Sequence, residues 1–356
     1  MSINPIQLSD RQRRSVLLLL FLIPFLMGCG VDLYVPSLPA IRTAFHTQAY
    51  NTQLTISFYM LGYALGQLVF GVLSDALGRR KMIVIPGAFF ALSSLLAINA
   101  SSIDMLIFSR GLQGFFIAGP AVVSRALATD CFKDLELSHA MTYIAMGWSL
   151  GPIIGPFLGG YLQDYFSWKA NFYFFVLYSV VIFSYAYFVL IETHPIRTPF
   201  HPVNFLKNLK TIVSSFSFFI YLLIAACIYS SMILFNLIGP FLIQTHLHFS
   251  AVAYGYMALT LGSANFLGNL TNRCLVSRLG QNKMVLIGLL GTLIMAVVLL
   301  FLGISYPLQV LMLILPSFLF LFFCGLVFPN AMTKATASFS HMGGTASAIY
   351  GTLMIS

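Results

Sequence analysis

The chain has 356 residues, of which 59% are hydrophobic and only 8% are charged. Soluble domains are about 25% charged and 45–50% apolar, so this composition excludes an ordinary soluble protein and predicts an all-α polytopic membrane protein. The net charge of +9 does not indicate nucleic-acid binding, because Lys and Arg recur in short clusters between apolar runs. The five cysteines have neither metal-ligand spacing nor the pattern of a disulfide framework, so no metal site is expected.

Ten apolar runs, each near the 20 residues that a membrane-spanning helix needs, follow one another along the chain. They lie at roughly 15–41, 52–74, 82–103, 105–129, 138–163, 170–191, 214–243, 250–272, 284–304 and 307–332, and an eleventh begins at 343 and reaches the last residue. The gap after the sixth run carries three prolines and several basic residues. The sequence therefore predicts an N-terminal half at 1–191, a linker at 192–213 and a C-terminal half at 214–356.

The Lys and Arg residues also predict the orientation of the chain. With the N-terminus inside, fourteen of them fall in inner segments, whereas the outer loops hold only Arg42 and Lys169. Because cytoplasmic loops are enriched in Lys and Arg, we expect the N-terminus and the linker to be cytoplasmic.

Two matches at nearly the same offset indicate an internal repeat. Residues 78–82 (GRRKM) match 280–284 (GQNKM), and residues 32–38 (DLYVPSL) match 236–242 (NLIGPFL). Chance similarity in apolar sequence explains either match alone, but two matches in order favour duplication. Two parallel halves with a substrate site between them form a known transporter architecture.

The segment GVLSDALGRRKM (71–82) combines glycines with charges at the inner end of the second run. Its Gly71 and Gly78 permit close packing and a tight turn, and Asp75 lies near Arg79 and Arg80. We interpret this segment as a cytoplasmic latch that holds one conformation, with a solvated loop as the alternative. Asp130, at the inner end of the fourth run, is placed with the latch, and a simple interfacial position is its alternative.

Two further segments carry unusual residues. In RGLQG (110–114), Arg110 and Gln113 are one turn apart inside an apolar run, where an arginine is costly unless it faces a cavity or a partner; snorkelling to the interface is the alternative. In GWSLGPIIGPFLGG (147–160), glycines four residues apart predict a close-packing face and two prolines predict a bend or hinge. These residues are Gly147, Gly151, Gly155 and Gly159, with Pro152 and Pro156.

Together these segments resemble the motifs of the major facilitator superfamily. The chain is most similar to the drug:proton antiporter group, in its bicyclomycin- and chloramphenicol-resistance branch, through DLYVPSLPAI (32–41) and the three segments above. The resemblance implies two six-helix halves in a bacterial inner membrane. The chain departs from the family pattern at Ala76, where family members commonly have Arg. The twelfth helix is missing and the eleventh is incomplete, so we expect a fragment or a truncated product.

Of the nine acidic residues in the sequence, only Asp32 lies well inside an apolar run. The other eight lie at predicted helix ends or in loops. A membrane-embedded ionisable residue is a functional candidate, so we expect Asp32 to exchange the coupling proton with Arg110 as its electrostatic partner. The resemblance implies the same role. The repeat places Asn236 opposite Asp32, which predicts a shared cavity, and a cap at the outer interface is the alternative.

The combined prediction is a proton-driven exporter of drugs or other small molecules that works by alternating access. It is not expected to be an enzyme, since the sequence has no HExxH motif and no pair of intramembrane carboxylates, and it is expected to need no cofactor beyond the proton gradient. Its expected partners are a small-molecule substrate, protons and the lipid bilayer, with no nucleic acid, and it is expected to be a monomer. The alternatives are a dedicated exporter of an endogenous metabolite such as a siderophore, a proton symporter, or a transport-inactive truncated product. The predicted substrate-cavity residues are Asp32, Tyr34, Tyr59, Tyr63, Arg110, Gln113, Met146 and Asn236.

Overall fold

The computed structural model describes residues 8–193, 211–305, 309–337, 339 and 349–354, without the side chains of Val72 and Asp75. Every regular element in these residues is helical, which confirms the predicted all-α class. Most of the linker predicted at 192–213 lies outside the described residues.

Six long helices form the part called here the N-terminal half, residues 10–189. Ser9 begins the first helix with a capping box, in which its hydroxyl accepts a hydrogen bond from the backbone N–H of Gln12. The chain leaves this helix at Asp32 and passes through a short 3-10 turn that contains Pro36. The elements are α1 (Asp10–Asp32), η1 (Val35–Ser37), α2 (Leu38–Ala44), α3 (Ala49–Leu77), α4 (Arg79–Ile98), α5 (Ile103–Cys131), α6 (Asp134–Tyr165) and α7 (Trp168–Val189).

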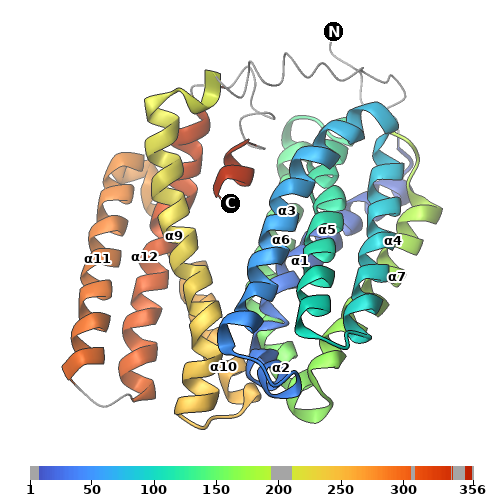
Figure 1. The fold of residues 1–356 in the computed structure, drawn as a ribbon. Helices are drawn as coiled ribbons and strands as arrows, with labels where there is room; N and C mark the ends of the chain where they lie inside the picture. Colours follow the sequence, from blue (N-terminus) through green and yellow to red (C-terminus); the bar gives the residue numbers. More distant parts are fainter. Residues whose placement is uncertain (1–7, 194–210, 306–308, 338, 340–348, 355–356) are drawn as a thin grey trace.

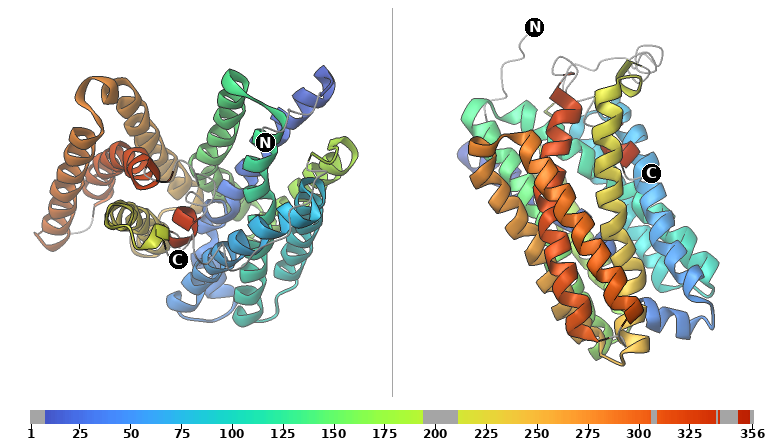
Figure 2. Two further views of the ribbon diagram at one scale, coloured as in Figure 1. Left: turned by 90° about the horizontal axis from the view of Figure 1, so that it is seen from above. Right: turned by 90° about the vertical axis from the view of Figure 1, so that its left-hand side faces the viewer.

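The described residues of the C-terminal half, which spans 216–354, form four long helices and a short helical segment at the C-terminal end. Its elements are α9 (Phe216–Pro240), the π-helix η2 (Phe241–His246), α10 (Ala251–Leu279), α11 (Gln281–Ser305) and α12 (Val310–Ala337). Residues 349–354 are helical and pack through Ile349 and Tyr350 into the hydrophobic core of this half. The two halves lie side by side as separate groups of helices, coloured blue to green and yellow to red (Figure 1, and from above in Figure 2).

The backbone supports the internal repeat. Helices α3 and α10 each have 29 residues, and each ends at a glycine with positive φ: Gly78 at +98° and Gly280 at +80°. This region of φ favours glycine, so the sequence match between GRRKM and GQNKM reflects the same sharp turn in both halves.

Eight helical segments among the described residues are long and apolar enough to span a membrane. The long helices α6 and α10 do not meet this criterion, although the sequence predicts spans there. Their lower hydropathy has a structural reason, because they pack against each other at the boundary between the halves. A helix that contacts another helix there exposes less of its surface to lipid, so it tolerates glycine and polar side chains.

Candidate functional site

Asp32 lies at the last residue of α1 and bridges the two halves. Its Oδ1 accepts a hydrogen bond from Nδ2 of Asn236 in α9, with 2.8 Å between the two atoms. Both residues are half-buried. The polar pair that the repeat predicts at one depth is therefore in direct contact, and an ionised Asp32 would make this a charge-assisted bond.

Arg110 in α5 is fully buried, and its partners differ from the prediction. Its Nη2 donates to the backbone carbonyl of Gly30 at 2.8 Å, and its Nη1 donates to Oε1 of Gln113 at 2.8 Å. The guanidinium carbon also lies 4.7 Å from the ring centre of Tyr34 and 4.2 Å from that of Tyr59. A carbonyl, an amide and two aromatic faces thus surround this cation.

Asp32 and Arg110, the expected electrostatic partners, form no salt bridge among the described residues. The two residues belong to the same level of the bundle, because Arg110 bonds Gly30 two positions before Asp32. Side chains two positions apart on an α-helix point in directions that differ by about 200°, because each residue turns the helix by about 100°. Gly30 therefore faces α3 and α5, whereas Asp32 faces α6 and α9, so the electrostatic partnership of Asp32 and Arg110 involves no direct contact in this conformation and stays a prediction.

The buried arginine belongs to a polar chain that crosses the N-terminal half. Gln113 donates from Nε2 to the hydroxyl of Ser94 in α4 at 2.6 Å, and Ser94 donates to a backbone carbonyl of its own helix. On the other side, Tyr34 donates to Thr55 in α3 at 3.1 Å. The predicted residues Arg110, Gln113 and Tyr34 therefore form one network that links α1, α3, α4 and α5.

The remaining predicted cavity residues differ in exposure. Tyr59 is 3% exposed, and its hydroxyl has no hydrogen-bond partner among the described residues. It approaches α1 closely at Gly30, where a Cβ would lie 2.0 Å from the Tyr59 hydroxyl oxygen. Tyr63 is also buried and donates to the sulfur of Met27 at 2.8 Å. Met146 is 49% exposed, unlike the three predicted tyrosines, so among the predicted cavity residues it has apolar surface available to contact another molecule.

The glycine face of α6 packs against α1. A Cβ at Gly147, Gly151 or Gly159 would lie 2.2, 2.4 or 1.8 Å from the α1 backbone or its continuation at Leu33. A Cβ at Gly155 would lie 3.2 Å from Cβ of Asp32. These contacts confirm one close-packing face. Helix α6 is continuous through Pro152 and Pro156, so the proposed hinge stays a prediction.

The other face of α6 meets α10 of the C-terminal half. At Gly160 and Gly255 a Cβ would lie 2.5 Å from the Ala251 carbonyl oxygen and 2.8 Å from that of Pro156. Tyr161 and Tyr256 share a hydrogen bond of 2.9 Å.

Further bonds join the halves at the same end of the molecule. Oδ2 of Asp164 accepts from the backbone N–H of Val252, in the first turn of α10, at 3.1 Å. That N–H has no partner within its own helix, so a carboxylate is favourable there. Gln244 in η2 donates to the Pro36 carbonyl, which joins the halves at 2.8 Å. These contacts were not predicted, since nothing in the sequence pairs positions so far apart.

The predicted latch contains a different set of partners. Nε of Arg79 lies 3.1 Å from Oδ2 of Asp130, and Nη1 donates to Ser74 at 2.7 Å. Glu192, which was not predicted, accepts from the Arg79 backbone N–H at 2.8 Å and so caps α4. The side chain of Asp75 lies outside the described residues.

The two glycines and the second arginine of the latch segment have different surroundings. A Cβ at Gly78 would lie 2.3 Å from Glu192, whereas one at Gly71 would meet only an ordinary contact at 3.7 Å. Arg80 points away from the latch and donates to the Tyr187 carbonyl at 2.6 Å. Among the described residues, no group of three or more His, Cys, Asp or Glu could hold a metal ion.

Comparison with known proteins places this arrangement in a family. The chain is 29% identical to Multidrug resistance protein D of Escherichia coli over 349 residues, covering 96% of this chain and 86% of that protein. It is 28% identical to a chloramphenicol resistance protein of Pseudomonas aeruginosa over 344 residues, 93% of this chain and 79% of that protein. A bicyclomycin resistance protein homolog of Haemophilus influenzae is 31% identical over 196 residues, 53% of this chain and 49% of that protein. The predicted resemblance to this branch is thereby confirmed.

The fold and the family model agree with these relatives. The crystal structure of a D-xylose-proton symporter superposes with a TM-score of 0.77 at 13% identity, covering 96% of this chain and 87% of that one. The model of the Major Facilitator Superfamily matches residues 20–355. The chain therefore belongs to the Major Facilitator Superfamily and is a multi-span membrane transporter rather than an enzyme.

Proposed function

We propose that this transporter is a proton-coupled exporter of drugs or other small molecules that works by alternating access. The observation that carries the proposal is the hydrogen bond between Asp32 and Asn236, which connects a membrane-embedded carboxylate to the opposite half. The names of the relatives, which include multidrug and chloramphenicol resistance proteins, support drugs as the exported compounds. An embedded acidic residue is the group that a proton-driven transporter requires.

The chemistry of the bond supports coupling. A hydrogen bond to a charged carboxylate contributes about 1.5–3 kcal/mol, roughly twice a neutral one. Protonation of Asp32 would remove the charge and weaken the contact with Asn236, so the proton would change the free energy of contact between the halves. Arg110 would act from the next turn, by fixing Gly30 and the end of α1 that carries Asp32.

We also propose that the protein lies in the bacterial inner membrane with a cytoplasmic N-terminus. The asymmetry of fourteen inner against two outer Lys and Arg residues supports this orientation. With this orientation, the bonds that join the halves would lie on the outer side, as in an outwardly closed conformation. These bonds run from Gln53 to the Leu237 carbonyl, from the Val252 N–H to Asp164 and from Gln244 to the Pro36 carbonyl. In such a conformation a cytoplasmic substrate would reach the site from inside.

The test uses Asp32→Asn, which keeps the shape and removes the titration. In proteoliposomes loaded with chloramphenicol as the probe, we expect this variant to lose uphill transport and substrate-induced proton release while retaining downhill exchange. Asp104→Asn, which changes an exposed carboxylate in the first turn of α5, is the matched control and should transport normally. Proton release by the Asp32→Asn protein would show that the carboxylate is only a cap.

A further inference from the structure

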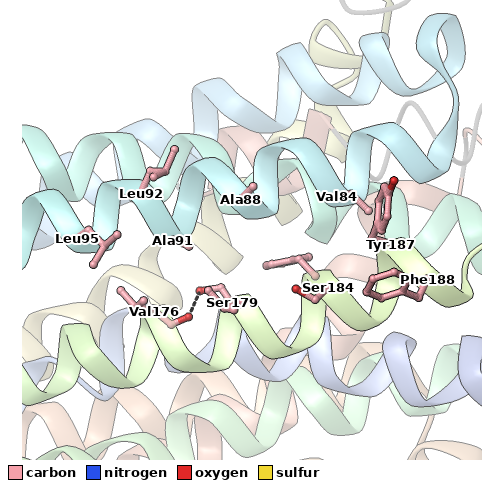
Figure 3. A pocket seen from close by; sticks show the side chains of 12 residues that line it. Val84, Ala88, Ala91, Leu92, Leu95, Val176, Ser179, Ser184, Tyr187 and Phe188 are labelled. Atoms are coloured by element: carbon pink, nitrogen blue, oxygen red, sulfur yellow. Dashed lines mark hydrogen bonds between the residues drawn. The ribbon is translucent and has the colours of Figure 1, made fainter.

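A groove lies on the outer surface of the N-terminal half, away from the site at Asp32. It runs between α4 and α7, has a volume of about 470 Å³, and is apolar except for Ser179, Ser184 and Tyr187 (Figure 3). The groove exists because the facing side chains are small: Ala88 and Ala91 on α4 oppose the two serines on α7.

The dimensions fit one leaflet of a bilayer. Along α4 the groove extends from Val84 to Leu95, which at 1.5 Å per residue is about 16 Å. The hydrocarbon core of a bilayer is about 30 Å thick, so the groove covers about half of it. Its walls, including Leu92 and Phe188, are largely exposed, and in a membrane such a surface is in contact with acyl chains.

One end of the groove carries a fixed positive charge. Tyr187 and Phe188 line this end, opposite the end formed by Leu95 and Val176 (Figure 3). The guanidinium of Arg80 lies 5.1 Å from the ring centre of Tyr187, and its Nη2 donates to the Tyr187 carbonyl. Arg80 forms no ion pair with a carboxylate in the described part of the chain. Since a guanidinium has five N–H donors, most remain for an external acceptor, and phosphate suits this geometry.

We infer that the groove is a specific site for an anionic phospholipid. One acyl chain lies between α4 and α7, and the phosphate binds Arg80, with the exposed Lys81 adding positive charge. The internal repeat makes the site specific to one half, because Asn282 and Lys283 occupy the positions of Arg80 and Lys81 in the other half. This inference does not depend on the proposed transport function.

The test is native mass spectrometry of the purified protein, titrated separately with dioleoyl phosphatidylglycerol, dioleoyl phosphatidylcholine and glycerol phosphate. We expect tight binding of one phosphatidylglycerol, weaker binding of phosphatidylcholine, and no competition by glycerol phosphate, which has a headgroup but no acyl chain. Arg80→Gln should weaken phosphatidylglycerol binding about fivefold, the effect expected for one basic residue near an anionic headgroup. Lys283→Gln, which removes a charge at the corresponding turn of the other half, should leave that binding unchanged.

A second variant tests the groove itself. Ala88→Phe fills the space between the helices without changing charge, so it should reduce phosphatidylglycerol binding. Its circular dichroism spectrum should equal that of the unsubstituted protein, which shows that the variant is folded. Equal affinity of Arg80→Gln and Lys283→Gln for phosphatidylglycerol would overturn the proposal. So would a dimer that dissociates on Ala88→Phe substitution, because the occupant would then be a second copy of the chain.

Discussion

The contact between α6 and α1 at Gly159 gives a sharp prediction. An added Cβ at this position would lie 1.8 Å from the carbonyl oxygen of Leu33, whereas real Cβ atoms essentially never approach another atom closer than 3.0 Å. The two backbones would have to separate by about 1.2 Å, and neither a flexible side chain nor a rotamer change can absorb this shift. Overpacking of this kind costs about 1–3 kcal/mol, and more when backbone must move.

Gly303→Ala is the matched control, because a Cβ at Gly303 in α11 meets nothing within 4 Å. There, alanine should be neutral or stabilising by up to about 1 kcal/mol through helix propensity. The helix-propensity gain is the same at both positions, so we expect Gly159→Ala to be about 1–3 kcal/mol or more less stable than Gly303→Ala. Thermal unfolding in detergent, followed by circular dichroism, should show a melting temperature several degrees lower. Equal melting temperatures would refute the close contact between α1 and α6.

The other predictions concern the latch and the two polar bridges. Arg79→Gln should lower transport because it removes the contact with Asp130, whereas Arg80→Gln should not, and the comparison of initial efflux rates measures this. Asp164→Asn should weaken the contact with the first turn of α10 by about 0.3–1 kcal/mol. Distance measurements between spin labels on α6 and α10 should then show a two- to fivefold smaller population in which these two helices are in contact. Asn236→Ala should lower the number of protons exchanged per substrate, measured in proteoliposomes, and an unchanged ratio would contradict the coupling role of its bond to Asp32.

Much of the fold was predictable because the signals are local. Apolar runs of spanning length predict the helices, and the paired GRRKM and GQNKM segments predict turns that the structure confirms at Gly78 and Gly280. The repeat also predicts that Asp32 and Asn236 lie at one depth, since equivalent helices of two halves cross the membrane alike. Four-residue glycine spacing predicts a packing face without knowledge of the partner helix.

The partners of the charged groups were harder to predict. Depth along a helix follows from residue number, but the direction in which a side chain points relative to other helices depends on packing. This is why Arg110 contacts Gly30 and two tyrosine rings instead of the carboxylate two positions further. The capping of α4 by Glu192 was also missed, because its acceptor role involves a backbone N–H that carries no sequence signal.

An exporter coupled to protons must prevent its empty, deprotonated form from changing conformation, because that step would let substrate leave without proton exchange. In the proposed scheme, the charge on Asp32 provides this restraint. A charge-assisted bond of about 1.5–3 kcal/mol to Asn236 would bias the empty carrier toward the conformation seen here by roughly ten- to 150-fold. Either a proton or a substrate that displaces Asn236 would remove the bias. Coupling would then follow from one hydrogen bond between the halves, because both ligands would compete with the same contact.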